Sequence, residues 1–246
     1  MKAGPAVQQR LLHLQGLDAA LARLEHRRRT LPELAVIEAA DGRLAELRDA
    51  VVRAETEVGD LDRDLRRLEN DVEQVRARSD RDRQRMQSGA VPARELESLQ
   101  HEVESLARRQ SDLEDAELEV MERREEAESR AAALRSEVDK LTAERDAAAA
   151  ARDTGWAGID TEAADDTTAR ATVAAELPGD LLALYEKVRA ASGGVGAAEL
   201  RHRRCEGCRL ELAGSELRAA RAAAPDEVLR CENCRRILVR TAESGL

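Results

Sequence analysis

Two pairs of cysteines near the end of the 246-residue chain are the residues whose types and spacing point most clearly to chemistry. Cys205 and Cys208 form one C-x2-C hook, Cys231 and Cys234 form a second, and 22 residues separate the hooks. Zinc in structural sites takes four tetrahedral ligands, and thiolate is a favoured donor. Two hooks supply all four positions, so the spacing predicts one structural Zn2+ with no position left for substrate.

Other uses of the four thiols stay open at the level of sequence. A disulfide or a thioredoxin-like redox pair would use one hook alone, but the strand–helix context of such a redox pair is missing. Cysteines of a cytoplasmic protein more often bind metal or act in catalysis than form disulfides. An iron–sulfur cluster would use the same four thiolates. We interpret His202 as a surface residue, because four cysteines already complete a site.

The sequence around the hooks predicts a small β ribbon. Three stretches have strand-like patterning, namely CRLEL (208–212), VLR (228–230) and RILVR (236–240). Residues 215–223 predict a short helix or turn between them. Gly207 and Asn233 occupy the same place in the two hooks, where we expect a left-handed backbone. Domains this small usually depend on metal or disulfides, so we expect metal loss to unfold the ribbon.

The rest of the chain is typical of long helices. Charged residues make up 37% of it, aromatic residues 1%, and Phe is absent, so a core built on aromatic bulk is excluded. Two series of apolar residues repeat every seven residues in the same segment, one over residues 37–72 and one over 40–75, and we call each series a heptad seam. This periodicity indicates a coiled coil rather than disorder. A third seam covers residues 99–148. Four polar residues interrupt its companion seam, namely Gln110, Glu117, Arg124 and Arg145.

Breaks in the apolar pattern divide the helical region into segments. Residues 31–86 and 93–150 are nearly equal in length, and the turn at 87–92 contains Gly89 and Pro92, which are typical of a helix end and a helix start. In an antiparallel hairpin the apolar seams of the two arms cover each other within one chain. We therefore predict a long antiparallel coiled-coil hairpin with these two arms.

The helices outside the hairpin complete the predicted architecture. A first helix at 6–29 needs a partner, and residues 153–177 are the candidate, although two glycines disfavour a helix there. Thr30 reads as the N-cap of the helix that follows it. We predict a mainly α fold with two domains, a helical coiled-coil domain at 1–191 and a small C-terminal β zinc ribbon at 197–246.

Composition also bears on location and activity. No run of about 18 apolar residues is present, so we expect no membrane span. The N-terminal stretch lacks the apolar segment of a signal peptide, and we expect a cytoplasmic, bacterial protein. A Gly-rich phosphate loop, a nucleophile elbow and an open metal site are all missing from the sequence, so we predict that the chain is not an enzyme.

Arginines cluster around both hooks although the whole chain has a net charge of −10. Residues 197–246 contain ten Arg and eight acidic residues, so the ribbon carries +2 and the rest of the chain −12. Eight of these arginines are candidates for binding nucleic acid or an acidic partner, namely Arg201, Arg203, Arg204, Arg209, Arg230, Arg235, Arg236 and Arg240. Alternatively, Glu206, Glu211 and Glu232 could pair with them and leave a neutral face. The ribbon has no aromatic side chain on which bases could stack.

These motifs resemble a known bacterial family. The stretches PARELESLQHEVESL (92–106), LLALYEKVR (181–189), CEGCRLEL (205–212) and VLRCENCRRILVR (228–240) are similar to the four-cysteine zinc-ribbon proteins with an N-terminal coiled-coil hairpin. That family includes a Helicobacter flagellar regulator, and this chain resembles its actinobacterial-type members most closely. The resemblance implies an elongated hairpin, a ribbon whose four cysteines hold zinc, and a nucleic-acid-binding or other binding role. The flagellar member's association with a sigma factor and a flagellin message concerns that lineage.

We therefore predict a non-catalytic adaptor that binds a macromolecular partner, with gene regulation as one setting. A protein is the expected partner, and no membrane is involved. The alternative is a nucleic-acid-binding regulator, for RNA or DNA, that acts through the Arg-rich ribbon. The sequence is compatible with a monomer and with a homodimer.

Overall fold

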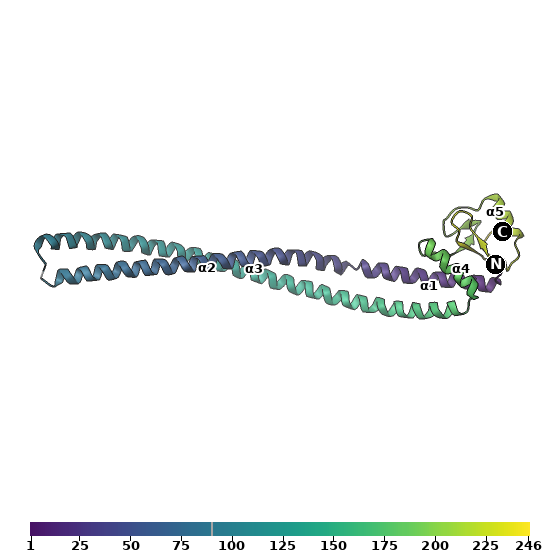
Figure 1. Cartoon of the computed structure of the whole chain (residues 1–246), viewed down its shortest axis with the longest axis horizontal. Helices are drawn as coiled ribbons and strands as arrows, with labels where there is room; N and C mark the ends of the chain where they lie inside the picture. Colours follow the sequence, from purple (N-terminus) through teal and green to yellow (C-terminus); the bar gives the residue numbers. More distant parts are fainter. Residues whose placement is uncertain (90) are drawn as a thin grey trace. The chain divides into compact units, whose positions relative to one another are not determined.

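The structure is a computed structural model that describes residues 1–89 and 91–246 (Figure 1). Its helices are α1 (Pro5–Arg29), α2 (Pro32–Gln87), α3 (Ala93–Ala175), α4 (Gly179–Ala191) and α5 (Gly214–Ala222). Its strands are β1 (Ala197–Arg201), β2 (Arg204–Cys205), β3 (Leu229–Arg230) and β4 (Ile237–Arg240). The predicted turn at 87–92 includes Ala90, which lies outside the described residues.

The elements form two compact units. One unit comprises Met1–Leu34 together with Ala149–Leu246, and the other comprises Ala35–Ala148. The predicted domains, 1–191 and 197–246, divide the chain at a different place and stay a prediction. Among the helices of the described part of the chain, none has the length and hydropathy needed to span a membrane.

The unit at Ala35–Ala148 is a coiled-coil hairpin formed by α2 and α3. From α2, Leu44, Leu47 and Leu61 are almost fully buried, and all three belong to the predicted heptad seams. From α3, Leu113 and Ala127 are buried at seven-residue multiples. The mainly α fold with a long helical hairpin is therefore confirmed, and burial of the two seams accounts for it.

Polar residues in the companion seam of α3 make contacts across the hairpin. Arg124 forms an ion pair with Asp62 of α2. Arg145 Nε lies 3.1 Å from Asp41 Oδ1, also on α2. Long arginine side chains can pack their stems on the seam and reach a carboxylate at its edge. Charge pairing therefore replaces apolar contact at these two interruptions of the seam.

In the other unit, α1 packs against the last part of α3. α3 runs past residue 150, the predicted end of the hairpin arm, and continues without a break to Ala175. Trp156, half-buried, donates its indole N–H to the Arg28 carbonyl at 3.1 Å. The prediction that 153–177 partners the first helix is thus confirmed, and this packing outweighs the low helix propensity of the glycines.

Thr30 plays a different role from the predicted one. Its hydroxyl donates to the His26 carbonyl at 2.9 Å, and its backbone N–H donates to the same oxygen at 3.0 Å. Thr30 is therefore the C-cap of α1, and α2 begins two residues later at Pro32. The predicted N-cap at Thr30 is wrong, because the free carbonyls at the end of α1 use its donors.

The four strands form one sheet in the order β2-β1-β4-β3. β1 and β4 are parallel at its centre, while β1–β2 and β3–β4 are antiparallel pairs. The predicted strand at 236–240 corresponds to β4 and the one at 228–230 to β3. The predicted strand at 208–212 is wrong, since this stretch contributes only the isolated bridge between Arg204 and Glu211. β1 was not predicted at all.

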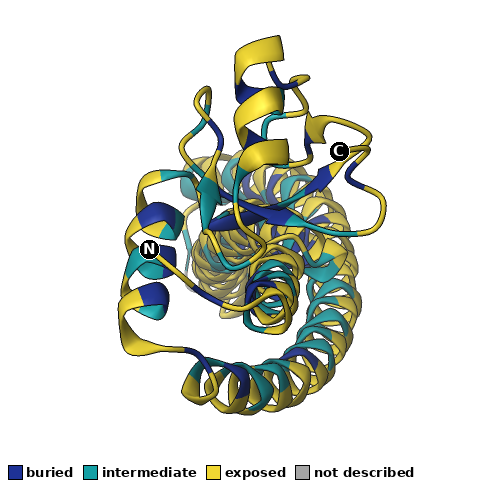
Figure 2. Ribbon diagram, turned by 90° about the vertical axis from the view of Figure 1, so that its right-hand side faces the viewer, coloured by how far each residue is buried: buried dark blue, intermediate teal, exposed yellow. Residues whose placement is uncertain are grey.

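The two faces of the sheet are buried against different partners (Figure 2). One face, with Ile237 and Val239 of β4, packs on the apolar side chains of α1, α4 and the end of α3. The other face, with Leu200 and Leu238, packs on the cysteine side chains. The alternation of β4 therefore places the helices and the hooks on opposite sides of one sheet.

Candidate metal centre

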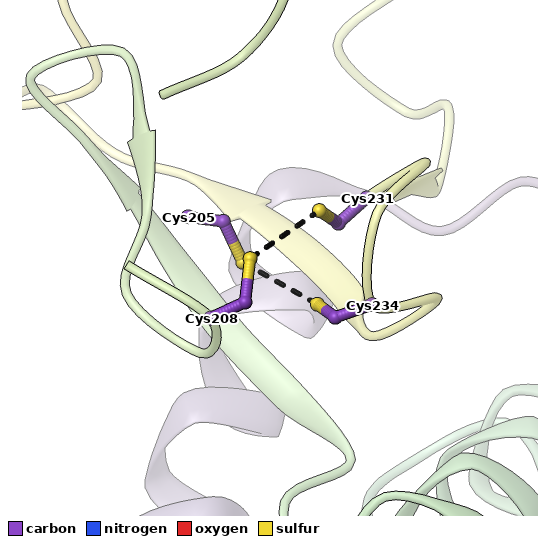
Figure 3. Close-up of side chains that lie close together, drawn as sticks. All are labelled: Cys205, Cys208, Cys231 and Cys234. Carbon is purple, nitrogen blue, oxygen red and sulfur yellow. Dashed lines mark hydrogen bonds between the residues drawn. The ribbon is translucent and has the colours of Figure 1, made fainter. Parts of the chain in front are cut away.

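The two cysteine hooks are attached to the two edge strands of the sheet, β2 and β3, and face each other. Cys205 ends β2, and Cys231 follows β3 directly. Figure 3 shows all four side chains converging, and their Sγ atoms all lie within 4.8 Å of one another. Cys205 and Cys231 are fully buried, whereas Cys208 and Cys234 are partly exposed. The exposed His202 lies outside this cluster.

The sulfur distances fit a tetrahedral metal site. The Sγ atoms of Cys205 and Cys234 are 3.8 Å apart, and so are those of Cys208 and Cys231. Four sulfurs at about 2.3 Å from a zinc ion lie about 3.8 Å from each other when the geometry is tetrahedral. A disulfide would require about 2.0 Å. The four thiols thus suit one Zn2+, and all four ligand positions are filled by protein.

Both hooks fold as the same tight knuckle. The backbone N–H of Arg209 donates to the Cys205 carbonyl at 2.7 Å, and that of Arg235 donates to the Cys231 carbonyl at 2.8 Å. The residue after the second cysteine of each hook has a left-handed backbone, with φ of 60° at Arg209 and 63° at Arg235. For a residue other than Gly this conformation costs about 1 kcal/mol or more.

The prediction of a left-handed backbone at Gly207 and Asn233 is therefore wrong, because the left-handed residue of each knuckle comes two positions later. Gly207 is required for a different reason. A Cβ at this position would lie 2.6 Å from Arg236 Cδ and 3.0 Å from Ala198 Cβ. The missing side chain lets the stem of Arg236 cross the first knuckle.

Burial and hydrogen bonding set the pKa values of the thiols. Burial raises the pKa of Cys205 and of Cys231. Burial also opposes ionisation of Cys234, but hydrogen bonds from the Arg236 backbone N–H and from neighbouring thiols outweigh it and lower its pKa to about 7. A metal ion adds a positive charge that favours thiolate at every ligand. Metal binding is therefore expected to release protons.

Two of the predicted partner-binding arginines are used inside the protein. Arg236 donates to the carbonyls of Ser192 at 2.8 Å and Gly207 at 3.0 Å, and so ties the end of α4 to the first knuckle. Arg240 donates to several carbonyls at the end of α5 and in the loop after it, at 2.6 Å for Ala224. Both side chains are partly buried. Their guanidinium groups are thus engaged in holding loops in place.

The other six arginines of the prediction are exposed. Arg201 forms an ion pair with Glu243 at 2.6 Å. The remaining five are Arg203, Arg204, Arg209, Arg230 and Arg235. Over residues 1–89 and 91–246, none of these five forms an ion pair, so the pairing considered for the hook glutamates is not found. The cluster keeps its positive charge available.

A buried ionic network connects α1 with α3 and α4. The Asp18 carboxylate of α1 is only 3% exposed. It accepts hydrogen bonds from Tyr185 Oη at 2.6 Å and from Arg170 Nε at 2.7 Å, and it lies 3.1 Å from Arg189 Nη2. Burial, together with the hydrogen bond to Asp18, raises the pKa of Tyr185. A buried carboxylate with two guanidinium groups and a phenol is fully partnered.

Gln15, one turn before Asp18, extends this network to the sheet. Its Oε1 accepts the backbone N–H of Gly196 at 2.7 Å, just before β1 begins. Sequence analysis missed this network. The available signal was the acidic Asp18 on the helix face that also carries Leu11 and Leu14, seven and four residues earlier.

Comparison with known protein families agrees with this architecture. The model of the CT398-like coiled coil hairpin domain matches residues 14–193, and the model of the C4-type zinc ribbon domain matches residues 204–238. The chain belongs to the CT398-like coiled-coil hairpin family. The resemblance drawn from the sequence motifs is thus confirmed, and so is a C4-type zinc ribbon whose four close cysteines fit one structural zinc.

Several relatives match over nearly the whole chain. Rv2229c from Mycobacterium tuberculosis is 42% identical over 98% of this chain and 98% of its own length. A solved structure from Mycobacterium smegmatis is 37% identical, covers 98% of this chain and 100% of its own, and has a TM-score of 0.88. CT398 from Chlamydia trachomatis has a TM-score of 0.72 at 17% identity, covering 96% of this chain and 98% of its own. This last likeness concerns the fold alone.

Proposed function

We propose that the chain is a non-catalytic adaptor that binds a macromolecular partner through its zinc ribbon. In this proposal one structural Zn2+ is held by Cys205, Cys208, Cys231 and Cys234. The observation that carries the proposal is the sulfur geometry, because four thiolates at tetrahedral spacing leave the ion no position for water or substrate. Neither matching family model describes an enzyme.

The two predicted domains take different roles in the proposal. Residues 1–191 serve as a helical arm, and residues 197–246 present the binding surface. The charge distribution supports this division, since the ribbon carries +2 and the rest of the chain −12. An acidic arm repels polyanions and places any contact with an anionic partner on the ribbon. A protein partner is favoured because the ribbon has no aromatic platform for bases.

Affinity capture from a lysate of the source cells, with and without nuclease, tests the adaptor function. The bait pair is the zinc-loaded protein and its Cys231→Ser variant, which lacks one of the four thiols. We expect defined proteins that bind the wild-type bait, resist nuclease and are lost with the variant. A partner retained equally by both baits would contradict a role for the zinc ribbon.

Nucleic-acid binding is the second candidate, and one observation favours it. Five exposed arginines of the ribbon form no ion pair within the described residues, so their charge is available to phosphates. Phosphate contacts weaken steeply as salt rises. Titration of duplex and single-stranded RNA and DNA at low ionic strength decides this case. Absence of binding at low salt excludes the nucleic-acid function and leaves the adaptor function standing.

A further inference from the structure

The two knuckles are repeats of one sequence and one geometry. Residues 204–209 read RCEGCR and residues 230–235 read RCENCR. In each, the first arginine donates to the carbonyl of the last, from Arg204 Nη2 to Arg209 at 3.1 Å and from Arg230 Nε to Arg235 at 2.9 Å. The same local frame is therefore built twice, with a pair of guanidinium groups on each.

The knuckles differ at the next residue. After the second knuckle comes Arg236, which is partly buried and donates to three carbonyls. The equivalent residue of the first knuckle is Leu210, whose carbonyl accepts the Cys205 N–H at 3.0 Å while the residue stays 53% exposed. The first knuckle thus presents a large apolar side chain beside its two arginines, and the second knuckle does not.

The arginine next to this leucine is held at a conformational cost. Arg209 has φ of 60°, a region that Gly adopts without strain and Asn tolerates. Within residues 1–89 and 91–246, its guanidinium makes no hydrogen bond or ion pair that would offset the strain. Arg235 has the same backbone conformation, so the turn of the knuckle requires it, whereas the exposed side chain of Arg209 is not used by the fold. The Arg209 side chain is therefore available to a molecule outside the chain.

The surface formed by Arg204, Arg209 and Leu210 combines positive charge with apolar area. Guanidinium groups bind carboxylates through paired hydrogen bonds, and an exposed leucine gains by burial against another apolar side chain. Glu206 and Glu211 are exposed in the same stretch and lower its net charge. These glutamates oppose a phosphate and a carboxylate alike, but a phosphate backbone gains nothing from the leucine. The mixture suits a protein segment better than a nucleic acid.

We propose that the first knuckle is a docking surface for an acidic protein segment that carries an apolar side chain. Carboxylates of the segment pair with Arg204 and Arg209, and its apolar side chain packs on Leu210. This inference rests on the adaptor function and deepens it by naming the chemistry of the partner and the half of the ribbon that receives it.

Fluorescence anisotropy with defined probes tests the docking surface on the zinc-loaded full chain. One labelled peptide alternates Glu with Leu, and a second of equal length and charge has Ser in place of every Leu. A labelled RNA duplex is the third probe. We expect the Glu–Leu peptide to bind, the Glu–Ser peptide to bind about ten-fold more weakly, and the duplex not to compete. Equal affinity for the two peptides, or preference for the duplex, overturns the proposal.

Two variants and one matched control assign the binding to the first knuckle. Arg209→Gly and Leu210→Ser should each weaken the Glu–Leu peptide about ten-fold. Arg235→Gly removes the equivalent arginine of the second knuckle and should leave the affinity within about two-fold. Both glycine variants should unfold at or above the wild-type temperature, because Gly adopts a positive φ without strain. An equal loss in Arg235→Gly overturns the assignment.

The remaining outcomes separate this inference from the adaptor function. If the peptides fail to bind while the Cys231→Ser bait still loses a protein partner, the docking surface is wrong and the adaptor function stands. If zinc-dependent capture fails, the adaptor function itself is contradicted. Concentration-dependent self-association that Leu210→Ser removes would show that the surface receives a second copy of the chain, which also overturns the proposal.

Discussion

The buried carboxylate of Asp18 offers a quantitative test of how the ribbon unit is held together. Asp18→Asn keeps the shape of the side chain and its acceptor for the Tyr185 hydroxyl. It removes the negative charge that faces Arg170 and Arg189, and it turns one acceptor oxygen into an NH2 group that faces donors. Both guanidinium groups then remain partly buried, at 21% and 34% side-chain exposure, without their shared counter-charge.

The expected cost follows from this geometry. Breaking a buried ion pair by removing one partner costs about 3–5 kcal/mol. Because the two arginines keep some contact with water, and Arg170 keeps its pairing with Glu186, we expect the lower end, about 3 kcal/mol of unfolding free energy. For a unit of this size that corresponds to a drop of about 10 °C in its thermal midpoint.

Fluorescence of the single tryptophan, Trp156, measures this change, since Trp156 of α3 contacts α1 in the same unit. Glu162→Gln is the matched control, because it neutralises a carboxylate on the same pair of helices whose partner, Arg27, is exposed. Exposed pairs contribute about 0–1 kcal/mol, so the control should stay near wild type. If Asp18→Asn unfolds within 0.5 kcal/mol of wild type, by the scale of such exposed pairs, the network does not hold the unit together.

Three further outcomes follow from the same structure. Cys231→Ser should lose zinc in a native mass measurement and disorder the ribbon, while circular dichroism still shows the helices of the 35–148 hairpin; loss of most helical signal would contradict this. The pKa of Tyr185 is higher in the folded than in the unfolded protein, so the neutral phenol should stabilise the fold fully below about pH 10 and progressively less above it. The ultraviolet absorbance of tyrosinate should therefore rise only with unfolding. Tyr185→Phe should remove this part of the pH dependence. In a urea titration, Gly196→Ala should destabilise the ribbon unit by about 2 kcal/mol, because the added Cβ would lie 2.7 Å from the Tyr185 ring. Gly158→Ala is the control and should be neutral or stabilising, since the space around Gly158 is open.

The parts of this structure that could be predicted from the sequence depend on local sequence patterns. The spacing of Cys205, Cys208, Cys231 and Cys234 defines a four-thiolate site without reference to the rest of the fold, and the four Sγ atoms do converge. Heptad periodicity requires only that one helix find a partner with the same period, so the hairpin of α2 and α3 was predictable from residues such as Leu44 and Leu113.

The parts that sequence analysis missed depend on distant contacts. β1 has the sequence AAELR, which favours a helix by propensity, and it becomes a strand because β4 supplies its parallel partner 40 residues later along the chain. The roles of Arg236 and Arg240 depend on carbonyls of loops that come together only in the folded sheet. From sequence they were indistinguishable from Arg235, whose side chain is exposed.

The shared core beneath the sheet has a consequence for biosynthesis. Leu11 and Leu14 pack with Ile237 and Val239, so α1 is synthesised well before β4, the strand on which it packs. The hairpin at Ala35–Ala148 is synthesised after α1 and before β4, and it can fold through its own local contacts. Until β4 emerges, the part of the α1 face that packs on this strand stays open to chaperones and proteases. A truncated product that lacks β4 should therefore be recognised and degraded, even though its long hairpin is intact.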